Sequence, residues 1–287
     1  MSQTITQETQ TPTVPAAHEA PPRGGKLAGR VAFVTGGTRG IGAAISQALA
    51  RQGATVASGY AGKTERAQDF LHDLQSAWAG HETEFSIHQG NIGNPEDCRR
   101  TIAEVIEKHG RLDILVNNAG ITRDRVVSKM SDDDWQQVID VNLSGAFYLS
   151  QAALKHMLER GTGRIVNVSS VIGEMGNIGQ ANYAASKAGL FGLTKTLARE
   201  AAFHLSRDGK LDDDTIGVTV NAVTPGYVLT EMVQGVPDKV LEKIKGNIPV
   251  HRLARPSEIA RVVHFLCADE SGFITGQVWG VNGGQDM

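Results

Sequence analysis

Two side chains four residues apart, Tyr183 and Lys187, have the types and the spacing to do proton chemistry. The surrounding run, from Gly179 to Gly189, is rich in Ala and contains no Pro, which favours a helix. Positions i and i+4 share a helix face, so the phenol would stand beside the ammonium. A phenol titrates near ~10, and a neighbouring cation lowers that pKa. The pair predicts a proton donor and acceptor for neutral pH, and the alternative is a surface Tyr beside a solvated Lys.

A glycine-rich turn lies between the first predicted strand, at 30–35, and the first predicted helix, at 41–51. Glycine lets the chain turn tightly and lets a ligand approach the backbone. The start of the helix would offer free N–H groups and a positive dipole end to a pyrophosphate. In this strand–turn–helix context the pattern predicts dinucleotide binding. The expected contacts come from Gly36, Arg39, Gly40, Ile41 and Gly42.

The end of the second predicted strand, Ala57-Ser-Gly-Tyr60, carries no carboxylate. An NAD site usually has one there for the ribose hydroxyls. Arg39 lies in the glycine turn instead, and Lys63 and Arg66 follow the strand. Cations without a carboxylate suit a 2′-phosphate, so the expected cofactor is NADPH (NADP+) rather than NADH. The alternative is that Arg39 pairs with a surface acid.

Short apolar runs alternate with longer amphipathic ones along the chain, which predicts an α/β fold with a single doubly wound parallel sheet of the Rossmann type and helices on both faces. We expect one domain at 27–287. The predicted strands are 30–35, 54–58, 84–88, 112–117, 164–169, 216–223 and 276–281. The predicted helices are 41–51, 65–78, 95–109, 132–160 and 181–205.

Bulk composition narrows the function classes. The 287 residues carry a formal net charge of −3, which gives no reason to expect a nucleic acid or a membrane as partner. The two cysteines, Cys98 and Cys267, are far apart and expected to be reduced, and no His/Cys cluster predicts a metal site. Residues 1–26 lack an apolar core, so we expect a disordered tail rather than a secretory signal, and a cytoplasmic enzyme.

Two segments depart from the alternating pattern. The polar, acidic stretch 206–215 is expected to form an exposed loop. The stretch 231–246 is helix-like and lies between Pro225 and Pro249, where it could cover a cleft beyond the strand ends. Its lysines, at 239, 243 and 245, are expected to be solvated, and the alternative is that they meet a phosphorylated substrate.

Four motifs in this order resemble those of the classical short-chain dehydrogenase/reductases: the glycine turn, the run Asn117-Asn-Ala-Gly120, and Tyr183 with Lys187 preceded by a serine thirteen residues earlier. The resemblance covers 27–287. It implies a catalytic tetrad of Asn142, Ser170, Tyr183 and Lys187, although Ser169 is adjacent to the serine. It also implies cofactor contacts from Asn118, Ala119 and Gly120, from Pro225, Gly226 and Val228 beside the nicotinamide, and from Asn91 and Ile92 beside the adenine.

Within that family, the runs 118–124, 176–183 and 281–284 resemble those of 3-oxoacyl reductases. The implied reaction is reduction of a 3-oxoacyl thioester by NADPH to the (R)-3-hydroxyacyl thioester. Asn91, Tyr227 and the run 270–276 favour acetoacetyl-CoA over an acyl-carrier-protein substrate. Carrier-protein reductases dock their acidic partner with two arginines; Arg164 fits one position, and the other is His204.

The resemblance implies further expectations. Ile178, Gln180 and Tyr227 are the candidates for the acyl pocket, although ordinary packing is the alternative for Ile178. A homotetramer is implied, with the helices near 132–160 and 181–205 at its interfaces. Two other functions stay open: a dehydrogenase of the same fold acting on another alcohol or ketone, and a dinucleotide-sensing regulator without turnover.

Overall fold

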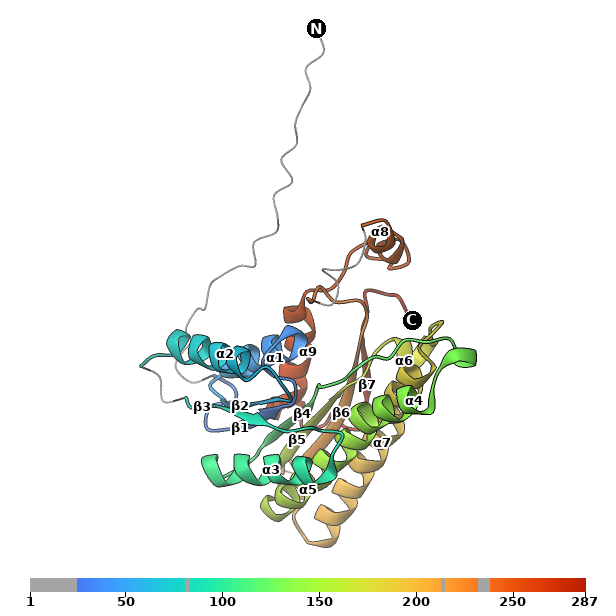
Figure 1. Ribbon diagram of the computed structural model, residues 1–287. Helices are drawn as coiled ribbons and strands as arrows, with labels where there is room; N and C mark the ends of the chain where they lie inside the picture. The colour runs from blue at the N-terminus through green and yellow to red at the C-terminus, as the bar shows by residue number, and fades with distance from the viewer. Residues whose placement is uncertain (1–24, 81–82, 213–214, 232–237) are drawn as a thin grey trace.

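The computed structural model describes residues 25–80, 83–212, 215–231 and 238–287 (Figure 1). Most of the expected tail, 1–24, lies outside the described residues. The two described residues of that stretch are Gly25 and Lys26, and the Lys26 ammonium pairs with Glu270 at 2.8 Å. Parts of the other two unusual segments, 213–214 and 232–237, also lie outside.

Seven parallel strands form the sheet of the described chain, in the order β3-β2-β1-β4-β5-β6-β7, which confirms the predicted doubly wound architecture. The order reverses between β1 and β4, the point where ligands bind in such sheets. The strands are β1 (Val31–Val34), β2 (Thr55–Tyr60), β3 (Phe85–Gln89), β4 (Ile114–Asn117), β5 (Gly163–Val168), β6 (Val218–Pro225) and β7 (Val278–Val281). The central strands are continuous buried runs, as expected where helices cover both faces.

Helices cover the two faces of the sheet in separate layers (Figure 1). On one face lie α1 (Gly40–Ala50), α2 (Thr64–Ala77) and α9 (Pro256–Cys267). On the other lie α3 (Pro95–His109), α5 (Gly145–Arg160) and α7 (Ala181–Arg207). The remaining elements are η1 (Val127–Lys129), α4 (Asp132–Ile139), η2 (Asp140–Ser144), α6 (Ile172–Met175), α8 (Asp238–Gly246) and η3 (Asp269–Ser271).

The region 132–160, predicted as one helix, is interrupted. It divides into α4 and α5 around η2, a five-residue π-helical segment that contains Asn142. π-Turns of this kind are frequent at functional sites because they displace one side chain from the regular helical register. Asn142 is buried here, and its amide bonds to the backbone of Ile121, beyond the end of β4.

Other differences from the predicted elements are local. Helix α9 was not predicted, although Pro256 at its first turn and the apolar spacing of Ile259, Val263 and Leu266 mark an amphipathic helix. Those three side chains are almost fully buried, and each contributes roughly 1.5–3 kcal/mol by burial. Helix α7 extends to Arg207, so the first residues of the expected loop at 206–215 are helical. The helix predicted within 231–246 begins at Asp238 among the described residues.

Candidate active site

The glycine turn between β1 and α1 is shaped for close approach of a ligand. Gly36 and Gly40 have φ of 61° and 52°, which glycine adopts without strain. A Cβ at Gly42 would lie 2.1 Å from the Gly36 carbonyl oxygen, so no larger residue fits without rearrangement. The first N–H groups of α1 are not capped by a side chain of the described residues, and Arg39 at its N-cap is exposed. These features fit a dinucleotide pyrophosphate at the start of α1.

Cations gather at the start of α2, beyond the end of β2. Lys63 is the N-cap residue, with φ of 57°, and Arg66 lies in the first turn of the helix. They line a surface hollow together with Thr64, Glu65 and Asp69. Arg66 forms an ion pair with Glu231, which lies 165 residues further along the chain. A 2′-phosphate at this end of the cofactor would therefore compete with the Glu231 carboxylate for Arg66.

The run after β4 is fixed to the glycine turn by hydrogen bonds. Asn118 Nδ2 donates to the Thr35 carbonyl oxygen at 2.9 Å, and the Asn118 and Ala119 N–H groups both donate to Thr35 Oγ1 at 3.0 Å. Gly120 lies between two tetrad members, because a Cβ there would be 3.2 Å from Asn142 Oδ1 and 3.5 Å from Lys187 Nζ. The predicted cofactor residues of β1, α1 and β4 thus form one surface at the carboxyl edge of the sheet.

Helix α7 places Tyr183 and Lys187 on one face, and the ammonium lies 5.7 Å from the centre of the phenol ring. Lys187 is 4 % exposed and its Nζ donates to the Val168 carbonyl oxygen at the end of β5, at 2.8 Å. The shared face expected from the i, i+4 spacing is therefore present. A buried ammonium held by a single carbonyl is able to donate to a further acceptor, because it has three N–H bonds.

The pKa of the phenol shifts in the opposite direction to the sequence-based expectation. Burial raises the pKa of Tyr183, the hydrogen bond with Ser170 offsets part of that effect, and the charge of Asp124 adds to it. Lys187 is not among these causes, and burial lowers its own pKa to about 8. The predicted lowering of the Tyr183 pKa by Lys187 is therefore wrong for this arrangement, because desolvation is the largest cause of the shift and it raises the pKa.

The two adjacent serines after β5 point to different partners. The Ser169 hydroxyl donates to the Lys187 carbonyl oxygen at 2.7 Å, within the backbone of α7. The Ser170 hydroxyl interacts with the Tyr183 phenol and accepts the Ile172 N–H at 3.2 Å. The geometry thus favours Ser170 as the serine that reaches a substrate oxygen beside the phenol.

Asn142 connects the π-helical segment to the strand ends. Its Oδ1 accepts the Ile121 N–H at 2.8 Å, and its Nδ2 donates to the Ile121 carbonyl oxygen at 3.0 Å and to Ser186 Oγ at 3.1 Å. Ser186 in turn donates to the Tyr183 carbonyl oxygen at 2.8 Å. Through Ser186, this network links Asn142 to the turn of α7 that carries Tyr183.

The two other cofactor segments lie along the same edge. Asn91 and Ile92 follow β3, and their backbone is held by α3. Pro225 ends β6, and its carbonyl oxygen accepts the Val171 N–H at 3.0 Å, next to Ser170. A Cβ at Gly226 would lie 2.9 Å from Asn282 Cα, and Val228 is buried where it bridges to Ala254.

The candidate substrate residues differ in their environment. Ile178 is 90 % exposed, which excludes ordinary core packing. Gln180 Nε2 donates to both carboxylate oxygens of Asp124, at 3.2 and 3.1 Å, so its amide is already engaged. Tyr227 is half-buried, and its carbonyl oxygen accepts the Ala254 N–H. Sequence reasoning assigned no role to Asp124, whose carboxylate acts on both Gln180 and Tyr183; only its place in the run 118–124 pointed to it.

Arg164 does not lie at a docking surface. It is 3 % exposed, its Nη1 donates to the Gly163 and Gly217 carbonyl oxygens, and its Nη2 lies 3.5 Å from Asp269. The expectation that Arg164 fits a carrier-protein docking position is therefore wrong, because the guanidinium is enclosed at the opposite edge of the sheet from Ser170. His204 lies near the end of α7 and is only partly buried.

Within 25–80, 83–212, 215–231 and 238–287, no group of three or more His, Cys, Asp or Glu side chains is arranged to hold a metal ion. None of the helices in that part of the chain combines the length and the apolar character that a membrane crossing requires.

Comparison with known proteins agrees with this geometry. The chain matches the family described as "Enoyl-(Acyl carrier protein) reductase" over residues 36–286. It is 48 % identical to the acetoacetyl-CoA reductase of Shinella zoogloeoides over 257 residues, which is 89 % of this chain and 98 % of the relative. It is 43 % identical to the 3-oxoacyl-[acyl-carrier-protein] reductase FabG of Staphylococcus aureus over 256 residues, 89 % of this chain and 98 % of that protein.

A third relative is the acetoacetyl-CoA reductase of Cupriavidus necator, 42 % identical over 258 residues, 90 % of this chain and 98 % of the relative. These matches extend over the glycine turn, the tetrad and both faces of the sheet. The chain therefore belongs to the short-chain dehydrogenase/reductase family.

Proposed function

We propose that this protein reduces the 3-oxo group of an acyl thioester, with acetoacetyl-CoA as the favoured substrate, NADPH as the reductant and the (R)-3-hydroxyacyl thioester as product. The observation that carries the proposal is the convergence of Ser170, Tyr183 and Lys187 at the carboxyl edge of the sheet. Relatives that are 48 % and 43 % identical to this chain are named as an acetoacetyl-CoA reductase and a 3-oxoacyl-carrier-protein reductase, which supports the proposal.

The bound dinucleotide supplies the hydride that reaches the 3-oxo carbon. Negative charge then develops on the carbonyl oxygen, and the Ser170 hydroxyl and the Tyr183 phenol are the two donors that face it. Ser170 stabilises the developing charge, and Tyr183 gives up its proton to form the alcohol. Lys187 supplies a cation beside the phenol, with N–H bonds left to hold a ribose hydroxyl of the cofactor.

The direction of the proton transfer suits reduction. Burial raises the pKa of Tyr183, so the phenol is protonated at neutral pH and ready to donate. A reverse oxidation needs the phenolate, whose formation the same burial opposes. Recovery of the proton from solvent passes along the polar groups between Lys187 and Asn142, which lie on either side of Gly120.

The cofactor preference rests on charge at the start of α2. Lys63 and Arg66 are placed for a 2′-phosphate, and Arg39 is exposed at the glycine turn. The proposal includes a cytoplasmic location, as expected from the sequence. It also includes assembly as a homotetramer. An acyl-carrier-protein thioester is the second candidate substrate, supported by the FabG relative.

Steady-state kinetics of the purified chain test the proposal. Acetoacetyl-CoA and a 3-oxoacyl-carrier-protein thioester are each offered with NADPH and with NADH, and the alcohol is analysed for its configuration. We expect the highest kcat/KM with acetoacetyl-CoA and NADPH. Tyr183→Phe should lower kcat at least a thousandfold and keep NADPH binding, whereas Tyr148→Phe, on α5, serves as the matched control. Higher kcat/KM with a polyol or steroid than with either thioester would refute the substrate assignment.

A further inference from the structure

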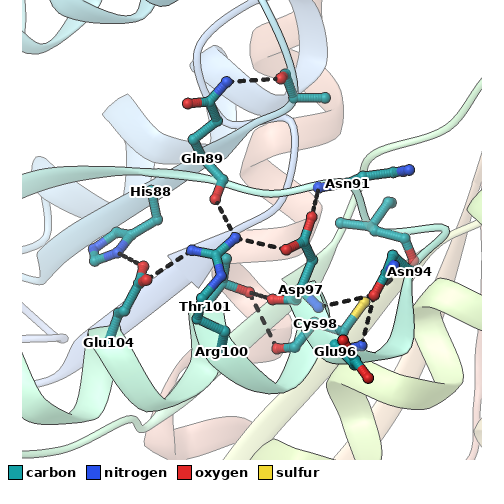
Figure 2. Close-up of polar contacts among 12 residues, drawn as sticks. His88, Gln89, Asn91, Asn94, Glu96, Asp97, Cys98, Arg100, Thr101 and Glu104 are labelled. Atoms are coloured by element: carbon teal, nitrogen blue, oxygen red, sulfur yellow. Dashed lines mark hydrogen bonds and ion pairs between the residues drawn. The ribbon is translucent and has the colours of Figure 1, made fainter.

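The segment that follows β3 is held to α3 by a dense set of contacts (Figure 2). The Asn91 N–H donates to Asp97 Oδ2 at 2.8 Å, and the Asn94 N–H donates to the Asn91 carbonyl oxygen at 2.9 Å. The Cys98 thiol donates to the Ile92 carbonyl oxygen at 3.2 Å. The Asn91 side chain extends away from Asp97 in Figure 2, and its Oδ1 accepts the Gly93 N–H at 3.0 Å.

Arg100 is the centre of this network. Its Nη2 donates to the Gln89 carbonyl oxygen at 2.9 Å and to Asp97 Oδ1 at 2.8 Å, and its Nη1 donates to Glu104 Oε1 at 2.7 Å. One rigid guanidinium therefore fixes both the last residue of β3 and the carboxylate that receives the Asn91 N–H. Arginine alone has a planar fork of donors that can satisfy three such acceptors at once.

The same segment packs too closely to α3 to shift freely. A Cβ at Gly90 would lie 2.8 Å from Thr101 Cγ2 and 3.6 Å from Arg100 Nη2. On its other side, a Cβ at Gly145 would lie 2.4 Å from the Ile92 carbonyl oxygen. Residues 90–93 are thus clamped between α3 and the start of α5, directly after the π-helical segment that carries Asn142.

We infer that Arg100 is a positioning residue for the adenosine half of the dinucleotide, acting through Asp97 on the backbone of Asn91 and Ile92. The inference rests on the proposed cofactor site, in which Asn91 and Ile92 lie beside the adenine. The hydrogen bonds of Arg100 reach Gln89, Asp97 and Glu104, and none of these is a tetrad member or an expected cofactor contact. Its role is to hold the adenine-facing segment at the distance that the ligand needs.

The exposure of Arg100 distinguishes a positioning role from a role in stabilising the fold. The Arg100 side chain is 47 % exposed, and exposed ion pairs contribute little to folding. Loss of the guanidinium should therefore leave the fold intact and change the position of 89–93. Adenosine binding depends on that position, whereas nicotinamide binding at the far end of the cleft does not.

Fluorescence titration of NADPH, without any thioester, tests the inference. In Arg100→Gln we expect the Kd of NADPH to rise about tenfold, and the Kd of the matching adenosine fragment, 2′,5′-ADP, measured by displacement, to rise by the same factor. The Kd of the reduced nicotinamide mononucleotide should stay within twofold of that of the unmodified protein. Arg99→Gln is the matched control, because Arg99 is the exposed neighbour whose guanidinium lies over the Tyr148 ring.

A double-mutant cycle tests whether Arg100 acts through Asp97. Asp97→Ala should weaken NADPH about as much as Arg100→Gln, and the double variant should weaken it no further than the stronger single variant. Additive losses in the double variant would refute the route. Equal weakening of the nicotinamide and adenosine fragments, or unchanged NADPH affinity in Arg100→Gln, would overturn the positioning role.

The binding assay also separates this inference from the proposed function. A chain that binds NADPH as described and fails to reduce any 3-oxoacyl thioester refutes the proposed function and leaves the role of Arg100 in place. If the unmodified chain binds neither NADPH nor NADH, both are refuted.

Discussion

The Lys187 ammonium lies 5.7 Å from the centre of the Tyr183 ring, and both groups are withdrawn from water. Burial acts on them in opposite senses, lowering the pKa of Lys187 to about 8 and raising that of Tyr183. The pair is therefore an acid held in its protonated form next to a cation that is costly to keep charged. At neutral pH the phenol therefore carries the proton that it can donate, and the buried charge of Lys187 carries a cost in stability.

Replacement of Lys187 by methionine should stabilise the fold while removing activity. A fall of the lysine pKa from 10.5 to about 8 corresponds to about 3 kcal/mol of unfolding free energy at neutral pH. In the variant the Val168 carbonyl oxygen loses its hydrogen bond to Lys187, which offsets roughly 1–2 kcal/mol of the gain in stability. We expect Lys187→Met to raise the unfolding free energy by about 1–2 kcal/mol at pH 7, measured by urea denaturation.

The pH dependence of that difference has a defined sign. Between pH 8 and 10.5 the unfolded chain binds more protons at Lys187 than the folded chain, so the stability of the unmodified protein rises through this window. The advantage of the methionine variant should therefore be largest below pH 8 and shrink above it. Lys155→Met, at an exposed position on α5, is the control. A less stable Lys187→Met protein at pH 7 contradicts the account.

The rate of reduction should also follow the charge of Lys187. Below pH 8 the ammonium is charged and the phenol protonated, so kcat should be level as the pH is varied. Above pH 8 the ammonium loses its proton, and kcat for reduction should decline. Steady-state rates between pH 6 and 10 at saturating NADPH measure this, and a kcat that increases across the same range would contradict it.

The two serines after β5 should respond differently to substitution. Ser170→Ala removes a donor to the substrate oxygen and should lower kcat about a hundredfold or more, with little change in stability. Ser169→Ala removes the hydrogen bond to the Lys187 carbonyl oxygen and should lower the unfolding free energy by about 1 kcal/mol. Rates and urea midpoints of both variants distinguish the two roles. The reverse pattern would exchange the assignments of the serines.

Local signals were sufficient to predict most of the sheet and the main motifs. Strand and helix periodicity, the glycine turn and the i, i+4 spacing of Tyr183 and Lys187 depend on short stretches of sequence. Helix α9, which was not predicted, also carries such a local signal, in Pro256 and the spacing of Ile259 and Val263. The π-helical segment at Asn142 was beyond reach, because the composition of 132–160 is that of a continuous helix.

Burial explains the errors in the site. The sign of the Tyr183 pKa shift depends on desolvation of the phenol in the folded chain, which spacing alone does not reveal. Arg164 was assigned to a docking surface from its position in the sequence, and the fold encloses it next to Asp269. The hydrogen bonds of Asp97 and Arg100 are also tertiary, since they join α3 to the end of β3.

The ion pair between Arg66 and Glu231 should weaken NADPH binding. Both side chains are well exposed, so their pairing contributes roughly 0.2–1 kcal/mol. Glu231→Gln frees the guanidinium for the 2′-phosphate and should tighten NADPH about two- to fivefold, while NADH affinity stays unchanged. Fluorescence titration with both cofactors measures this difference. Glu242→Gln, on α8, is the control for loss of an acid nearby in sequence, and equal tightening of NADH would contradict competition at the phosphate.

An exposed stripe on α7 should lie in an interface between copies of this chain. Gly192 lies within this 27-residue helix, where glycine costs ~1 kcal/mol relative to alanine. Within the described part of the chain, a Cβ built there meets no atom within 4 Å. Phe203, three turns further on the same face, is 63 % exposed. A glycine with open space around it, on the same helix face as an exposed aromatic, is expected where a second helix packs closely.

Light scattering of the purified chain tests this arrangement. We expect a mass about four times the 30.6 kDa of one chain, as the family resemblance implies. Gly192→Glu should place a charge in the interface and give smaller species, with the circular dichroism of the helices retained. Gln75→Glu, at an exposed position on α2, adds the same charge on a different face and should leave the mass unchanged. A monomeric unmodified chain, or a Gly192→Glu variant of unchanged mass, would show that α7 faces solvent.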